Sequence, residues 1–114
     1  MPRTKISSSR KTTRVVMGDT VIKKSYDERS LFLDLDRAIE LLEDKFSSIG
    51  VNAKISLEGN MLDIRVGSVC IALYENGAIE AYSNLSDEKL LDKCLKAVEE
   101  IIEDVATEFG EFGE

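Results

Sequence analysis

The chain has 114 residues, 43% of them apolar, and a formal charge of −7. This length suffices for one domain with a single core and needs no disulfide or metal to hold it together. The charge is uneven, because residues 1–24 hold seven Lys or Arg and one acid, whereas residues 25–114 hold eight and twenty-one. We therefore expect a basic amino-terminal arm on an acidic body that by itself repels nucleic acid.

Missing residue types exclude several kinds of catalysis. Histidine is absent, so no nucleophile can be activated by a histidine base. Cys70 and Cys94 are far apart and fall on a predicted strand and a predicted helix, which is not the spacing of a zinc site. No glycine-rich phosphate loop precedes a predicted helix. We expect a protein that is not an enzyme and that needs no cofactor or metal.

The same survey bears on where the protein works. The sequence has no signal segment and no run of eighteen apolar residues, and two cysteines do not make a secreted disulfide framework. We expect a soluble cytoplasmic protein with no membrane contact. The absence of glutamine and the high share of Glu and Lys are typical of a thermophilic source.

The amino-terminal segment has two parts. Residues 1–12 carry serines and cations without an apolar period, so we expect them to be a disordered basic arm. Residues 14–17 and 20–23 are apolar-rich and flank Gly18-Asp19, which predicts either a short hairpin or one kinked edge strand. Residues 25–30 read as a polar loop. The expected folded domain is 13–110, followed by a short acidic tail, 111–114.

A first helix is predicted from Asp34, a good N-cap, to Gly50, which fits the left-handed position after a helix end. Its apolar face consists of residues at helical spacing: Leu35, Ala38, Ile39, Leu42 and Phe46. The acids on the opposite face are expected to be solvated.

The stretch 51–83 reads as a four-stranded antiparallel meander. Two-residue turns at Gly59-Asn60 and Gly67-Ser68 place one set of apolar residues opposite each other on one face. In the last hairpin, an Asn76-Gly77 turn would put Glu80 into the core. A three-residue loop with Gly77 in the left-handed position avoids an unpaired buried carboxylate, so we favour pairing Leu73 with Ile79.

A second helix is predicted to start at Ser86 as N-cap and to end at Gly110. Its apolar stripe is about eighteen residues long and consists of Leu91, Leu95, Val98, Ile102, Val105 and Phe109, with Cys94 and Ile101 widening it. We expect both helices to pack on the core face of the sheet. Cys94 is then a small core residue.

The order of these elements resembles one half-repeat of the TATA-binding protein family. The local likeness lies in residues 69–81, VCIALYENGAIEA, followed by a helix from Asp87. The resemblance implies an α+β fold of strand, helix, four-stranded meander and helix, in which a DNA-binding saddle would require a homodimer. It implies no binding residue here, because Asp63 and Glu80 occupy the face that the family uses for the minor groove.

The sheet face opposite the helices is the candidate partner-binding surface. It mixes charge with a thiol and two tyrosines, as binding surfaces do; the residues of interest are Lys54, Arg65, Cys70, Tyr74 and Tyr82. An ordinary half-wet sheet is the alternative interpretation. Cys70 is the more exposed thiol and the candidate for reaction or for crosslinking a dimer.

Three functions remain open from sequence. The first is a small nucleic-acid-associated protein, expected to form a homodimer, whose arm neutralises phosphates through Arg3, Lys5, Arg10, Lys11, Arg14, Lys23 and Lys24. The second is an adaptor, inhibitor or assembly factor that binds a protein through the open sheet face. The third is a structural subunit of a viral or filamentous assembly that associates through the strand near residues 15–22.

Overall fold

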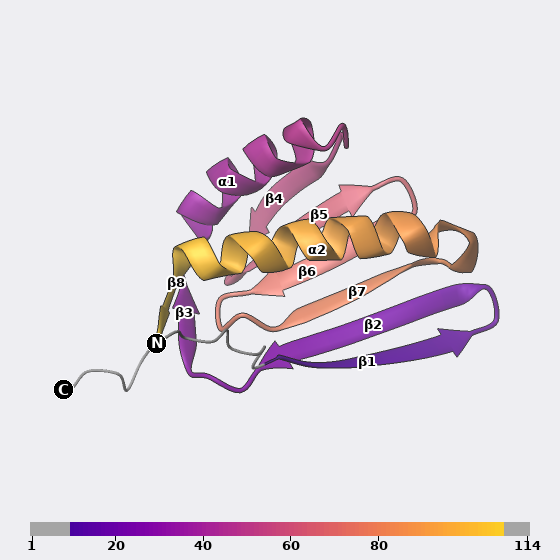
Figure 1. Cartoon of the computed structure of the whole chain (residues 1–114), viewed down its shortest axis with the longest axis horizontal. Helices are drawn as coiled ribbons and strands as arrows, with labels where there is room; N and C mark the ends of the chain where they lie inside the picture. Colours follow the sequence, from indigo (N-terminus) through magenta and orange to yellow (C-terminus); the bar gives the residue numbers. More distant parts are fainter. Residues whose placement is uncertain (1–9, 109–114) are drawn as a thin grey trace, which may run out of the picture.

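The computed structural model describes residues 10–108 and has an α+β fold, as predicted (Figure 1). Six antiparallel strands form one sheet in the order β1-β2-β7-β6-β5-β4. Their bounds are β1 Arg10–Met17, β2 Thr20–Asp27, β4 Lys54–Glu58, β5 Met61–Val66, β6 Val69–Tyr74 and β7 Ile79–Asn84. The helices α1 (Leu35–Ser48) and α2 (Glu88–Val105) lie side by side on one face of it. The other face is open.

The hairpin of β1 and β2 adds two strands to the predicted meander. Gly18 and Asp19 form its two-residue loop, and Met17 pairs with Thr20. Of the two readings of this segment, the hairpin is therefore the one observed. β2 pairs with β7, so β1 becomes one edge of the sheet and β4 the other. β1 begins at Arg10, so residues 10–12 belong to the sheet; the rest of the expected arm lies outside the described residues.

The predicted register of the meander is confirmed. Ile64 pairs with Ile55 on one side and with Ile71 on the other, and Leu73 pairs with Ile79. Gly77 has φ +91° and donates its N–H to the Tyr74 carbonyl at 2.8 Å, which closes the three-residue loop. The core side of the sheet is consequently apolar across its middle strands.

The first helix begins and ends as predicted. The Asp34 carboxylate accepts a hydrogen bond from the Arg37 N–H at 3.2 Å, which caps the first turn. Gly50 follows the helix end with φ +74°. α1 lies over β4 and β5, and α2 over β6 and β7, so the core is a single layer between helices and sheet. Cys94 is fully buried in it, as expected.

Both predicted ends of the second helix are wrong. A 3₁₀ turn, Leu85–Asp87, precedes α2, and Ser86 therefore does not cap it. The Asp87 carboxylate accepts from the Ser68 hydroxyl instead, at 2.7 Å. At the other end, α2 stops at Val105 because the next residues, β8 (Ala106–Glu108), pair with β3 (Leu31–Leu33) in a separate two-stranded sheet. The predicted polar loop 25–30 is also partly wrong, because β2 continues to Asp27.

Candidate protein-binding face

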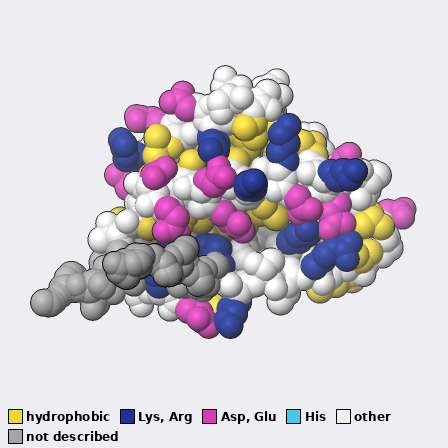
Figure 2. All heavy atoms as spheres, in the orientation of Figure 1, with side chains coloured by type: hydrophobic (Ala, Val, Ile, Leu, Met, Phe, Trp, Pro, Cys, Tyr) yellow, Lys and Arg dark blue, Asp and Glu magenta, His cyan; other side chains and the backbone are white. Residues whose placement is uncertain are grey.

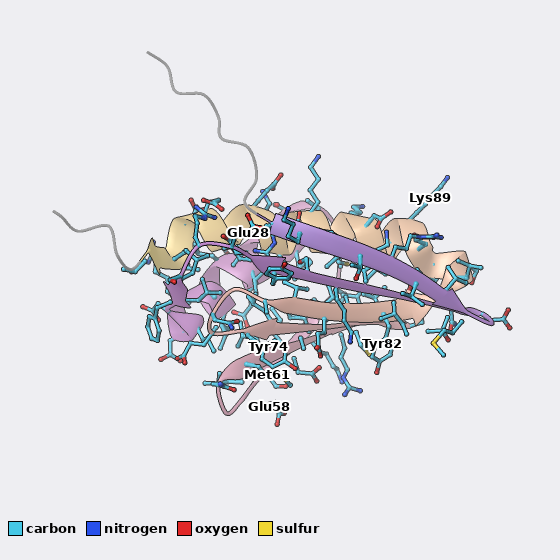
Figure 3. The ribbon with its side chains drawn as sticks, turned by 90° about the horizontal axis from the view of Figure 1, so that it is seen from below. Glu28, Glu58, Met61, Tyr74, Tyr82 and Lys89 are labelled. Atoms are coloured by element: carbon cyan, nitrogen blue, oxygen red, sulfur yellow. The ribbon has the colours of Figure 1, made fainter. Side chains whose placement is uncertain are left out.

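The open face of the sheet carries the side chains that point away from the helices. Figure 3 views the molecule nearly along the plane of the sheet and shows Tyr74, Tyr82, Met61 and Glu58 projecting on this side, opposite Lys89 of α2. Strand pairing places one row of side chains straight across all six strands: Val15, Ile22, Tyr82, Cys70, Arg65 and Lys54. The row begins apolar at β1 and ends cationic at β4.

The half of the open face near β1, called the apolar half below, carries exposed apolar side chains near the hairpin turn, and Lys11 and Lys24 lie further along the same face. Val15 is 49% exposed, Met17 63% and Tyr82 50%, and Ile22 lies between Val15 and Tyr82 in the same row. A shallow hollow of about 240 Å³ lies beside them; its lining includes Ile22, Lys24, Cys70, Ala72, Glu80 and Tyr82. Such a cluster of large exposed apolar side chains is typical of a surface that is covered by a partner.

The half near β4 is charged, and two of its charges form an ion pair. The Arg65 Nε donates to the Asp63 carboxylate at 2.9 Å, two residues away on the same strand face. The Tyr74 hydroxyl donates to the Glu80 carboxylate at 3.2 Å. These pairs place positively and negatively charged groups beside the apolar half. Protein interfaces often have such a polar rim around an apolar contact area.

Cys70 lies in the middle of this face, directly between Arg65 and Tyr82 in the strand register. It is a free, half-buried cysteine. A hydrogen bond with Cys70 is the main reason why the pKa of Tyr82 is raised, and nearby Asp63 acts in the same direction. The Tyr82 hydroxyl can donate or accept a hydrogen bond with a bound group.

All five predicted partner-binding residues thus come together on one face. Tyr82, Cys70, Arg65 and Lys54 share a row, and Tyr74 lies four residues further along β6 on the same face. The apolar half was missed from sequence: Val15, Met17 and Ile22 were not assigned to it. The turn at Gly18-Asp19 sets the pairing of β1 with β2. If β2 had also been paired with β7, these residues would have been placed on the open face beside Tyr82.

The predicted phosphate-binding cations are divided between the two faces of the hairpin. Arg14, Lys23 and Arg10 lie on the helix side, beside acids of the body. The Arg14 Nε and Nη2 donate to the two Glu88 carboxylate oxygens at 2.6 and 2.7 Å. Lys23 contacts Glu88 at 3.0 Å and also contacts Asp92.

Arg10 is held more deeply. Its guanidinium donates to the Ser25 hydroxyl at 3.2 Å and to the Gly77 carbonyl, and it lies 3.7 Å from the Asp27 carboxylate. Burial lowers its pKa, although nearby acids oppose this. Lys24 and Lys11 project from the open side, and Lys11 lies 3.6 Å from Glu28. Arg3 and Lys5 lie outside the described residues.

The helix side of the molecule has a mixed charge pattern. Figure 2 views this side and shows Lys and Arg side chains interleaved with Asp and Glu. Ion pairs account for part of the pattern, such as Lys45 with Glu100, which joins α1 to α2 and lowers the pKa of Glu100. Within residues 10–108, this side therefore offers no continuous cationic track for a phosphate backbone.

Comparisons of the chain with protein-family models, curated proteins and solved structures found no match. The resemblance to the TATA-binding protein half-repeat therefore stays a prediction. In the described part of the chain, no helix combines the length and apolarity needed to cross a membrane. Over the same residues, no three acidic, cysteine or histidine side chains gather into a group that could hold a metal ion.

Proposed function

We propose that this protein is a non-enzymatic protein-binding module that docks its partner on the open face of the six-stranded sheet. The observation that carries the proposal is the exposed apolar half of this face, centred on Ile22 and Tyr82 and bounded by paired charges. A partner of matching chemistry presents apolar or aromatic side chains ringed by polar groups. Tyr82 is the expected anchor, because it offers both a large apolar ring and a hydroxyl donor.

The geometry supports nucleic-acid binding less well. Four of the cations assigned to that role are engaged by the protein's own acids, namely Arg10, Lys11, Arg14 and Lys23. A phosphate would have to compete with carboxylates that are already in contact, and each such exchange weakens the gain from counterion release. Contact of the amino-terminal residues with nucleic acid remains the alternative proposal, carried by Arg3, Lys5 and Lys24.

Site-specific photocrosslinking in the source cell tests the proposed face. A photoreactive phenylalanine analogue replaces Tyr82 in one variant and Lys89, on the helix side, in the control (Figure 3). We expect position 82 to yield a protein adduct heavier than two copies of the chain, and position 89 to yield none. Adducts at both positions or at neither would contradict the proposed face, and an adduct with nucleic acid would favour the alternative.

A further inference from the structure

The edge strand β1 is unusually open to pairing. It is eight residues long, pairs one-to-one with β2 without a bulge, and contains no proline. In the part of the chain that the structure describes, no strand pairs with its outer edge. Its last three residues, Val15, Val16 and Met17, are all apolar and exposed. Natural edge strands are usually protected by a bulge, a proline or charge, because such an edge is a template for another strand.

The cations of β1 do not protect it as free charges would. Arg14 is bound to Glu88 through two hydrogen bonds, so its charge is locally neutralised by its own chain. Lys11 lies 3.6 Å from Glu28. The strand can therefore approach a second positive strand with less repulsion than its sequence suggests.

We infer that β1 pairs with β1 of a second copy of this chain, antiparallel and around a two-fold axis perpendicular to the sheet. The symmetry keeps the open faces of both copies on the same side, so opposed residues must share a face. The register centred on Thr13 satisfies this condition. It sets Lys11 against Val15 of the second copy and Thr12 against its Arg14, and no cation opposes another.

The position of the apolar half argues for a second copy as the occupant. The row Val15–Ile22–Tyr82 ends at the β1 edge, where its outermost member is half exposed. In the register centred on Thr13, this row continues into Lys11 and Tyr26 of the second copy, so the exposed side of Val15 meets the aliphatic part of a lysine. The two halves near β1 then adjoin across the two-fold axis, and the charged halves lie at the outer ends of the joined sheet. β1 can therefore meet itself without opposing cations, a match that a strand of an unrelated protein does not have built in.

The opposite edge is a poorer site for the same pairing. β4 has five residues and carries only one large exposed apolar side chain, Leu57, which is 47% exposed. Pairing of β1 with β4 of another copy would also be heterologous, and repetition of that contact gives open chains of molecules. Pairing of β1 with β1 closes at two copies. The inference goes beyond the proposed function, because it concerns an edge of the sheet and not its face.

Charge substitution on β1 tests the pairing and its register together. Val15→Lys would set lysine against Lys11 of the second copy at both ends of the contact. The matched control is Leu57→Lys, because the two side chains are equally exposed in one chain. In the double variant Lys11→Glu/Val15→Lys, the opposite charges meet only across the two copies, since residues 11 and 15 of one strand are four positions apart.

Native mass and sedimentation are measured over a concentration series through the micromolar range, with circular dichroism as the check of folding. We expect dimers for the unchanged protein and for Leu57→Lys, single chains for Val15→Lys, and recovery of the dimer in the double variant. A monomeric unchanged protein, a dimeric Val15→Lys, species larger than dimers, or a folded double variant that stays monomeric would overturn the inference. Circular dichroism unchanged in Val15→Lys excludes unfolding as the cause of dissociation.

Discussion

Asp27 and Arg29 hold the end of the hairpin against the rest of the molecule. The Arg29 guanidinium donates to both Asp27 oxygens, at 2.9 and 2.7 Å, and reaches the Glu103 carboxylate of α2 at 2.9 Å. The Asp27 side chain is fully inaccessible to solvent and also faces Arg10. Hydrogen bonding from Arg29 lowers the pKa of Asp27, although burial opposes this shift. One carboxylate thus serves two arginines, one on β1 and one in the loop after β2.

Replacing Asp27 by Asn should destabilise the fold more than the same substitution in an exposed ion pair. The change removes one of the anions near the largely buried Arg10 and replaces one of the two oxygens that accept from Arg29 by an NH2 donor, a loss of about 2–3 kcal/mol in the free energy of unfolding. Asp63→Asn is the matched control, because Asp63 also binds an arginine two residues later, but on the exposed face. Urea unfolding measures both. Equal losses in the two variants would show that burial of Asp27 does not matter.

The local elements of this fold are predictable from sequence because their signals are local. The core face of the meander follows from alternation and turn residues, and α1 follows from Asp34, Gly50 and an apolar stripe. β3 and β8 are three residues each and carry no such signal. Their pairing depends on where the carboxyl end of α2 lies, and that position is set only by the folded molecule. The same holds for the apolar half of the candidate site, which depends on β2 joining β7.

The loop between β6 and β7 requires glycine at position 77. Gly77 has φ +91°, and a Cβ there would lie 3.2 Å from the Leu31 Cδ1. Gly77→Ala should therefore cost about 1–2 kcal/mol for the backbone conformation and more for the contact. Gly67→Ala is the control, since its φ is +59° and a Cβ would meet nothing within 4 Å. Thermal unfolding should rank Gly77→Ala below Gly67→Ala, and the reverse order would contradict the described loop.

At the scale of the whole molecule, opposite charges from distant segments bring hairpin and body together. The seven cations of residues 1–24 read as a free arm in sequence, because the sequence does not say that α2 runs alongside them. In the fold, a single carboxylate, that of Glu88, contacts both Arg14 and Lys23. Part of the positive charge of the amino-terminal residues is thus paired with acids of the same molecule. For this reason the uneven charge along the sequence does not by itself identify a partner.

These contacts make acid stability a test of how the hairpin is held. Hydrogen bonds from Arg14 and Lys23 lower the pKa of Glu88 from 4.5 to about 2. The unfolded chain therefore takes up this proton first as the pH falls. Glu88 contributes stability above pH 4.5, and the contribution is lost as the pH falls through about 2. Below both pKa values it is absent.

We expect Glu88→Gln to flatten the decline in the free energy of unfolding between about pH 5 and about pH 2, relative to the unchanged protein. Denaturant unfolding at a series of pH values measures the slope. The control, Glu100→Gln, removes a pair between the two helices and leaves the hairpin contacts in place. Hydrogen exchange of the β1 amides should accelerate at neutral pH in the first variant only. Unchanged exchange there would mean that Glu88 does not hold the hairpin.

The pairing of β3 with β8 has a consequence for the order in which the chain can fold. Leu31–Leu33 emerges early during synthesis, but its strand partner, Ala106–Glu108, is among the last described residues to be made. β2 likewise waits for β7. Contacts so distant in sequence form only after a long loop is closed. The amino-terminal hairpin therefore leaves the ribosome first but must remain unpaired with the main sheet until β7 has been translated, and β3 must wait for β8.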